Sequence, residues 1–222
     1  MSVSLIIDEN GFTSLAAYKL LYSCEPLMNQ FVTTHIVWIE TLKSPCDSTF
    51  ITSKINVLIS KHILNIPYPP NTLRNIARFG ALTKIHLIAD IENHFSKNAN
   101  YLLNSIANKV TKQNVIAIRR FEYDENEREP ETPQILKDML KTRKAFEFHH
   151  FLASKSHAIE NLDAWLNYSV NLTNHVTIVP IKYMGSTWEP QLMVHTLHPY
   201  HFEGVPIRFA DQQMLPYELC RA

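Results

Sequence analysis

Glycine is scarce in this chain, with four among 222 residues, and neither a GxGxxG nor a GxxxxGKS/T loop occurs. These two loops hold phosphates in dinucleotide-binding and P-loop proteins, so their absence argues against a plain nucleotide-binding domain of either kind. A hydrophobic content of 45% and the low glycine count argue for a packed globule and against a disordered chain.

Net charge, cysteine and long apolar runs are also limited. Lysine plus arginine equal aspartate plus glutamate at 21 each, so no excess of positive charge is available for nucleic acid or an anionic membrane. The three cysteines, Cys24, Cys46 and Cys220, form no CxxC pair, which argues against a zinc module. One disulfide plus a free thiol and three reduced thiols both stay open. The N-terminus has neither a membrane-length apolar run nor a charged signal peptide.

Apolar periodicity predicts alternating strands and helices. Helices are expected at residues 12 to 22, 70 to 80, 98 to 110, 134 to 144 and in a last segment that reaches residue 219. Strands are expected at residues 3 to 7, 33 to 40, 55 to 59, 85 to 89, 114 to 118, 176 to 181 and 191 to 196. This alternation predicts an α/β fold with a mostly parallel central sheet flanked by helices. The length suits one large domain or two small ones.

Two acids follow the expected strand at residues 85 to 89. The strand is short, apolar and rich in β-branched residues, as expected of a buried parallel strand. Asp90 and Glu92 come where this strand leaves the core, and ligands of open α/β sheets bind beyond the carboxyl ends of the strands. Two carboxylates one residue apart suit Mg²⁺ or Mn²⁺, with substrate phosphates completing the shell. An acidic turn without a metal is also common, so both interpretations stay open here.

The segment that leads into these acids contains a longer pattern. Residues 69 to 78 read Pro-x-Asn-x-Leu-Arg-Asn-x-Ala-Arg and are followed by the apolar strand and Asp90-Ile91-Glu92. This run resembles glycosyltransferase family 49, and its two acids resemble the DxD motif of nucleotide-sugar glycosyltransferases. Later segments agree in order, at residues 117 to 122, 162 to 166, 188 to 190, 208 to 211 and 218 to 219. The family includes a β-1,4-glucuronyltransferase first described as a β-1,3-N-acetylglucosaminyltransferase, and the second catalytic domain of LARGE-type dystroglycan glycosyltransferases. The resemblance runs from about residue 65 to the end.

The resemblance implies a single glycosyltransferase-A type domain over residues 1 to 222. Its implied reaction is inverting transfer of GlcNAc or glucuronate from a UDP-sugar to a glycan hydroxyl, on a protein O-glycan or a poly-N-acetyllactosamine acceptor. The implied cofactor is Mn²⁺ or Mg²⁺ at Asp90 and Glu92. Members of the family are type II membrane glycoproteins of the Golgi, with a signal-anchor ahead of a luminal catalytic domain.

The chain also departs from the family pattern. Glu92 stands where the family has Asp, and its carboxylate reaches about one methylene further. The family continues past the Glu-Leu segment with a Gly-aromatic stretch and a histidine that resembles a further metal ligand, so we expect this domain to be incomplete at its C-terminus. The alternative function is therefore a catalytically silent relative, which would act as a binding or assembly partner of other Golgi glycosyltransferases.

Three residues are candidates for binding the donor nucleotide. Arg74 and Arg78 lie one turn apart on the expected helix, and a guanidinium matches a diphosphate or a carboxylate; ion pairing on the helix surface is the alternative. Asp8 follows the first expected strand, where a doubly wound sheet would meet a nucleotide. A solvated turn is the alternative for Asp8.

Candidates for the acceptor side lie in the second half of the chain. Glu189 and Asp211 are candidates for the base that deprotonates the acceptor hydroxyl; an N-cap is the alternative for Asp211. Trp188 beside Glu189 is suited to covering the C–H face of a sugar, with a core position as the alternative. A role for Trp165 on the acceptor side is implied by the resemblance alone.

Histidines and glycosylation sequons complete the candidate residues. There are two histidine clusters. One contains His149, His150 and His157, and the other contains His195, His198 and His201. Neither has the i, i+4 helical spacing of a metal pair, so surface or hydrogen-bonded histidines are favoured over a zinc site. Sequons at Asn167 and Asn171 fit a luminal destination.

Overall fold

A computed structural model describes residues 1–7, 12–38, 68–171, 176–205 and 210–221. Asp8, Cys46 and the strand expected at residues 55 to 59 lie outside these ranges. The chain divides into two compact units, and each is interrupted in sequence. Unit 1 comprises residues 1–82 and 201–211, and unit 2 comprises residues 83–200 and 212–222.

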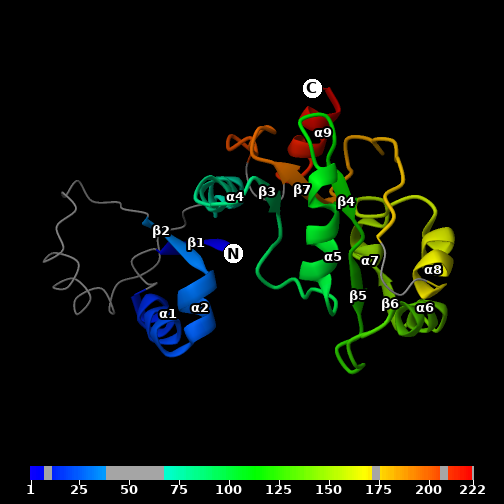
Figure 1. Cartoon of the computed structure of the whole chain (residues 1–222), viewed down its shortest axis with the longest axis horizontal. Helices are drawn as coiled ribbons and strands as arrows, with labels where there is room; N and C mark the ends of the chain where they lie inside the picture. The colour runs from blue at the N-terminus through cyan, green and yellow to red at the C-terminus, as the bar shows by residue number, and fades with distance from the viewer. Residues whose placement is uncertain (8–11, 39–67, 172–175, 206–209, 222) are drawn as a thin grey trace, which may run out of the picture. The chain divides into compact units, whose positions relative to one another are not determined.

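Unit 1 is built on two parallel strands, β1 (Ser2–Ile7) and β2 (Thr33–Trp38), which pair from Ser2 with Thr33 onwards. The helices α1 (Phe12–Cys24) and α2 (Pro26–Phe31) connect them, as the crossover between parallel strands requires. Both strands and the first helix confirm the sequence prediction (Figure 1). The short helix α2 was not expected, although Pro26 stands at the first helical position that proline favours.

Helix α4 (Pro70–Phe79) packs against both strands of unit 1. Pro70 occupies the first turn, where a missing N–H costs nothing, and the Gly80 N–H closes the helix on the carbonyl of Ile76. The residues that α4 buries are mostly polar. They are Pro70, Asn71, Leu73, Asn75 and Arg78. A buried polar face requires hydrogen-bonding partners, and the carbonyls of His201, Phe202 and Asp211 supply them for Asn71 and Asn75.

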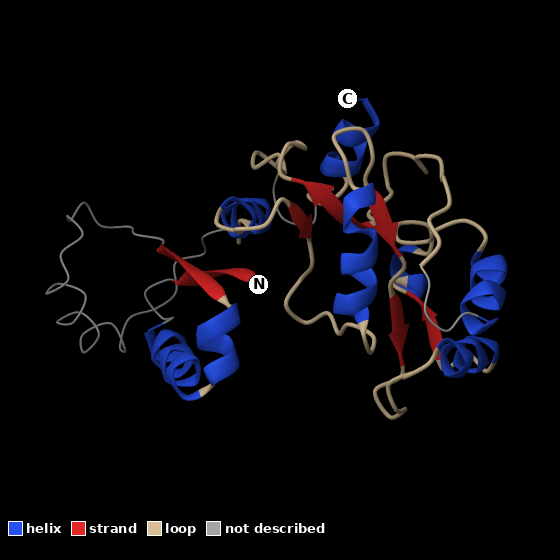
Figure 2. Ribbon diagram, in the orientation of Figure 1, coloured by secondary structure: helices blue, strands red, loops and turns tan. Residues whose placement is uncertain are grey.

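Unit 2 contains a three-stranded sheet in the order β3 (Ile85–Leu87), β7 (Gln191–His195), β4 (Ile116–Ile118). The central strand β7 is antiparallel to both neighbours, so β3 and β4 run in the same direction. A separate antiparallel pair joins β5 (Phe121–Tyr123) to β6 (Ala145–Glu147), and Figure 2 shows how short these strands are.

These sheets correct the predicted sheet architecture. The protein is mixed α/β, but among the described strands only the pair β1–β2 is parallel, and the mostly parallel central sheet is not seen. Residues 85 to 89 were expected to form a central strand, whereas β3 is an edge strand of three residues. The centre belongs to β7, whose first four residues are all buried. Apolar character alone shows that a strand is buried, but it does not identify the neighbours of that strand.

Alternation along β7 buries side chains on both faces of the sheet. Met193 packs on one side with Ile106 and Val110, and Val194 packs on the other with Leu215. The helices of unit 2 are α5 (Ala99–Ile106) with the 3-10 turn η1 (Ala107–Lys109), α6 (Pro133–Lys141), α7 (His150–Ala153), α8 (Leu162–Asn171) and α9 (Met214–Arg221).

Two parts of the secondary-structure prediction for unit 2 failed. Residues 176–181 were predicted as a strand, but they form no strand and are mostly exposed. The strands β5 and β6 and the helices α7 and α8 were not expected. None of the helices in the described ranges is long and apolar enough to cross a bilayer.

Candidate functional site

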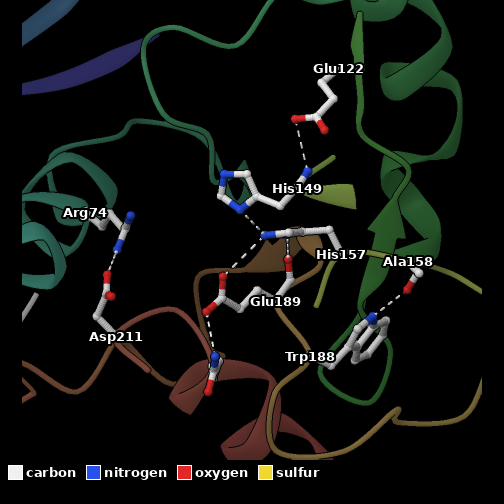
Figure 3. A network of polar contacts seen from close by, with 9 residues as sticks. Arg74, Glu122, His149, His157, Ala158, Trp188, Glu189 and Asp211 are labelled. Atoms are coloured by element: carbon white, nitrogen blue, oxygen red, sulfur yellow. Dashed lines mark hydrogen bonds and ion pairs between the residues drawn. The ribbon is translucent and has the colours of Figure 1, made fainter. Parts of the chain in front are cut away.

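The backbone of residues 156–160 is fastened to the Trp188-Glu189 segment in unit 2. The Glu189 N–H donates to the carbonyl of Ser156, and the Trp188 indole N–H donates to the carbonyl of Ala158 at 2.9 Å. The His157 imidazole is bound to the carbonyl of Glu189 at 2.6 Å (Figure 3). The candidate base Glu189 therefore projects from backbone whose N–H and carbonyl are both hydrogen-bonded.

Arg119, which follows β4, holds the other end of this loop. Its guanidinium donates to the carbonyl of Ile159 at 2.6 Å, to the carbonyl of Glu160, and to the Glu147 carboxylate at 3.0 Å. Burial lowers the pKa of Arg119, and the charge and hydrogen bond of Glu147 act against that shift. The planar guanidinium is suited to binding several acceptors in fixed directions.

The hydrogen bonds of His157 define its tautomer. A carbonyl oxygen can only accept, so Nδ1 carries the proton that binds Glu189. Nε2 lies 3.1 Å from Nδ1 of His149 and 3.4 Å from Oε2 of Glu189. Burial lowers the pKa of His157 to about 4, with positive charge at Arg120 and His149 adding to the effect. The hydrogen bond to Glu189 and the charge of Asp90 oppose this shift. His157 is therefore neutral at pH 7, and its Nε2 is an acceptor.

The two carboxylate oxygens of Glu189 have different neighbours. Oε1 accepts a hydrogen bond from Gln213 at 2.8 Å, while Oε2 faces His157. The side chain of Glu189 is 19% exposed, so it is accessible but largely enclosed. The backbone N–H of His149 donates a hydrogen bond to the Glu122 carboxylate at 3.2 Å.

Sequence reasoning found Glu189 but missed these partners. It favoured surface or hydrogen-bonded histidines over a metal site at His149 and His157, but two nearby histidines give no sign of which carboxylate they will meet. Nothing in the sequence around Gln213 indicated a role, since its partner Glu189 lies 24 residues away.

Asp90 and Glu92 lie in a turn after β3. The Asn93 N–H donates to the carbonyl of Asp90 at 3.1 Å, which makes residues 90–93 a β-turn. Asp90 is half-buried and Glu92 is exposed. Within the described ranges, no group of three or more histidine, cysteine or acidic side chains is arranged to hold a metal. Two carboxylates nevertheless fit a Mg²⁺-type ion that shares its remaining positions with water and substrate phosphates.

In unit 1, Asp211 is paired with Arg74. The guanidinium of Arg74 lies 3.0 Å from Oδ2 of Asp211 and 3.0 Å from Oδ1 of Asn71, and the Arg74 and Asp211 side chains are each 14% exposed. The alternative role of Asp211 as an N-cap is not what the structure shows, because α9 begins only at Met214. Arg78 is 4% exposed and so belongs to the buried face of α4.

Two asparagines of α4, one helical turn apart, bind the backbone of residues 201, 202 and 211. Asn71 donates to the carbonyls of Phe202 and Asp211 at 2.8 Å each. Asn75 donates to the carbonyl of His201 at 2.8 Å and accepts from its N–H at 2.9 Å. We call these two asparagines with Arg74 the α4 polar clamp.

The two tryptophans have different surroundings. Trp188 is 6% exposed and its ring meets Tyr183 edge-on, so its placement matches the core alternative. Trp165 on α8 is half-buried, stacks on Phe121 with centroids 5.7 Å apart, and has Arg119 over its ring. Sugar binding by either ring stays a prediction.

The sequon residues Asn167 and Asn171 lie on the exposed side of α8. Asn171 donates to the carbonyl of Asn167 at 2.8 Å, and Lys137 donates to the Asn167 side chain at 2.6 Å. Their glycosylation stays a prediction.

Cys24 and Cys220 are exposed free thiols.

In the second histidine cluster, the imidazole of His198 accepts a hydrogen bond from the backbone N–H of His195 at 3.0 Å.

Comparison with known proteins extends the motif resemblance to the whole chain. The family model described as "Glycosyl-transferase for dystroglycan" matches residues 1–222, including the part before residue 65 that carried no recognisable motif. No curated protein gives a significant match.

Proposed function

The chain belongs to the family of glycosyltransferases for dystroglycan, and from that premise we propose a metal-dependent inverting enzyme. It would transfer GlcNAc or glucuronate from a UDP-sugar to a hydroxyl of a protein O-glycan or a poly-N-acetyllactosamine glycan. We propose a glycosyltransferase-A type fold and a Golgi-lumen location as a type II membrane protein, which the family resemblance implies.

Glu189 is the better candidate for the base. A base must reach the acceptor hydroxyl and accept its proton, and Glu189 is partly exposed and bound at Oε1 by the uncharged amide of Gln213. Asp211 instead carries an ion pair with Arg74 at 3.0 Å, so one of its carboxylate oxygens already has a charged partner.

The family match over residues 1–222 carries the proposal. Within unit 2, His157 contacts the candidate base Glu189, and the charge of Asp90 makes a small contribution that raises the pKa of His157, which supports a shared site for the candidate base and the candidate metal ligand. A divalent ion bound by Asp90 and Glu92 would neutralise charge that develops on the leaving UDP. Asp90 and Glu92 would orient the diphosphate, and Glu189 would take the proton of the acceptor hydroxyl. Arg74, Arg78 and Asp8 remain candidates for nucleotide contacts.

Calorimetry with UDP tests the metal and nucleotide parts together. We expect UDP to bind in Mn²⁺ and to lose at least tenfold in affinity in chelator or in the Asp90→Ala plus Glu92→Ala variant. A matched control replaces two exposed acids of the loop after β5, Glu125→Ala plus Glu131→Ala, and should bind as wild type does. Folded protein indifferent to UDP and Mn²⁺ would refute the enzyme proposal and support the silent-partner alternative, which Glu92 in place of Asp motivates.

A further inference from the structure

Two groups converge on the Nε2 atom of His157. This atom is 3.1 Å from Nδ1 of His149 and 3.4 Å from Oε2 of Glu189, and the His157 side chain is only 2% exposed. Because Nδ1 of His157 is committed to a carbonyl, Nε2 of the neutral ring has one lone pair and no proton. In the resting protein, this lone pair accepts from Nδ1–H of His149.

The approach of Glu189 to Nε2 is unfavourable while the carboxylate is charged. Two lone pairs then face each other across 3.4 Å with no proton between them. The contact becomes a hydrogen bond when Glu189 is protonated, because Oε2–H can donate to Nε2. Neutral His157 therefore stabilises the protonated form of Glu189 relative to the ionised form.

From this geometry we infer that His157 is a positioning residue for Glu189, whose Nε2 receives the hydrogen bond that forms when Glu189 takes the acceptor's proton. The inference rests on the proposed function and extends it to a residue outside the carboxylates. His149 would hold the Nε2 lone pair in place before the reaction, and Gln213 would hold the opposite carboxylate oxygen.

The transfer step conserves atoms, electrons and protons. The bond between the anomeric carbon and the UDP oxygen breaks, and its electron pair leaves with UDP. The acceptor oxygen forms the new bond to that carbon, and its proton passes to Glu189. The Glu189 Oε2–H then displaces the His149 N–H from the single lone pair of His157. Interactions that form only as the proton moves raise kcat and leave substrate binding unchanged.

Two substitutions at His157 separate this role from simple support of the backbone. Asn places an amide N–H near the Nδ1 position and can keep the bond to the Glu189 carbonyl, but it has nothing at Nε2. Gln reaches the Nε2 position with an amide oxygen that can accept, but it loses the Nδ1 donor. His150→Asn is the matched control, because His150 is exposed and its ring packs on Phe146 and Phe151.

The assay measures release of UDP from UDP-GlcNAc and UDP-glucuronate in Mn²⁺, with an N-acetyllactosamine oligosaccharide or a glycosylated peptide as acceptor. Losing one hydrogen bond to an ionisable group should lower kcat about ten- to a hundredfold in His157→Asn, with KM within about twofold of wild type. His157→Gln should recover part of the lost kcat, although it is the less stable variant. His150→Asn should match wild type.

The outcomes separate the two proposals. Active wild type with an unchanged kcat in His157→Asn, or a loss confined to KM, overturns the inference and leaves the proposed function standing. A kcat that follows thermal stability across both variants also overturns it, since that result indicates support of the backbone alone. Wild type that turns over neither nucleotide sugar overturns the proposed function and this inference with it.

Discussion

Gly80→Ala should destabilise unit 1 through a single steric contact. Gly80 ends α4 with φ of −79°, an ordinary value for any residue, so the backbone imposes no strain on alanine. A Cβ at this position would instead run into the imidazole of His35 on β2. Of its three nearest ring atoms, even the most distant, Nδ1, would lie only 2.9 Å away. The ring is also bound at Nε2 by the Ser2 hydroxyl at 2.9 Å, which opposes its rotation.

The net effect follows from two opposing terms. Overpacking costs about 1–3 kcal/mol, while replacing glycine in a permitted conformation returns about 0.4–1 kcal/mol. The free energy of unfolding should fall by about 1–2 kcal/mol, which lowers Tm by roughly 2–8 °C for a chain of this size. Since the cost comes from one ring, Gly80→Ala in a His35→Ala background should be neutral or stabilising.

The assay is urea unfolding of wild type, both single variants and the double variant. The double-mutant cycle should give a coupling free energy of about 1–3 kcal/mol between the two positions. An equal effect of Gly80→Ala with and without the imidazole would refute the steric reasoning. It would mean that the glycine is needed for another reason.

Other predictions address the α4 polar clamp, the Arg119 contacts and His157. Asn75→Ala removes both hydrogen bonds to the backbone of His201 and should lower the free energy of unfolding by about 2–3 kcal/mol, measured as a lower urea midpoint. Arg119→Lys keeps the charge but loses the planar fork, so amides of residues 156–160 should exchange at least about tenfold faster by hydrogen exchange, whereas unchanged rates would contradict the role of the fork. Burial holds the pKa of His157 at about 4, below the unfolded value of about 6.5, so the unfolded state binds more protons between these values. The His157 contribution is complete above pH 6.5 and is lost as the pH falls towards 4, by up to about 3 kcal/mol; His157→Phe should remove this dependence in urea titrations.

Local features of the sequence predicted local structure well. Pro70 and the spacing of apolar residues located α4, and its end at Gly80 followed from the glycine. Residues 176–181 have the apolar pattern of a strand but no partner strand among the described residues, and they remain exposed. A strand requires a neighbour, and the pattern of one segment does not supply it.

The candidate site shows the same division between local and distant information. Glu189 could be named from the Trp-Glu-Pro motif, whereas His157 comes 32 residues earlier and meets it only in the folded chain. Asp211 was named as a base or a helix cap from its neighbours in sequence. Its ion pair with Arg74 spans 137 residues, and no spacing rule could have shown that pairing.

The α4 polar clamp also has a consequence for the order in which the protein is made. Asn75 is synthesised 126 residues before His201, its hydrogen-bonding partner. At about 5–20 residues per second, the ribosome needs roughly 6–25 s to deliver that partner. During this interval α4 must keep its asparagines solvated, because burying them unpaired would be costly. Unit 1 therefore cannot complete its folding on the ribosome until most of unit 2 has been translated.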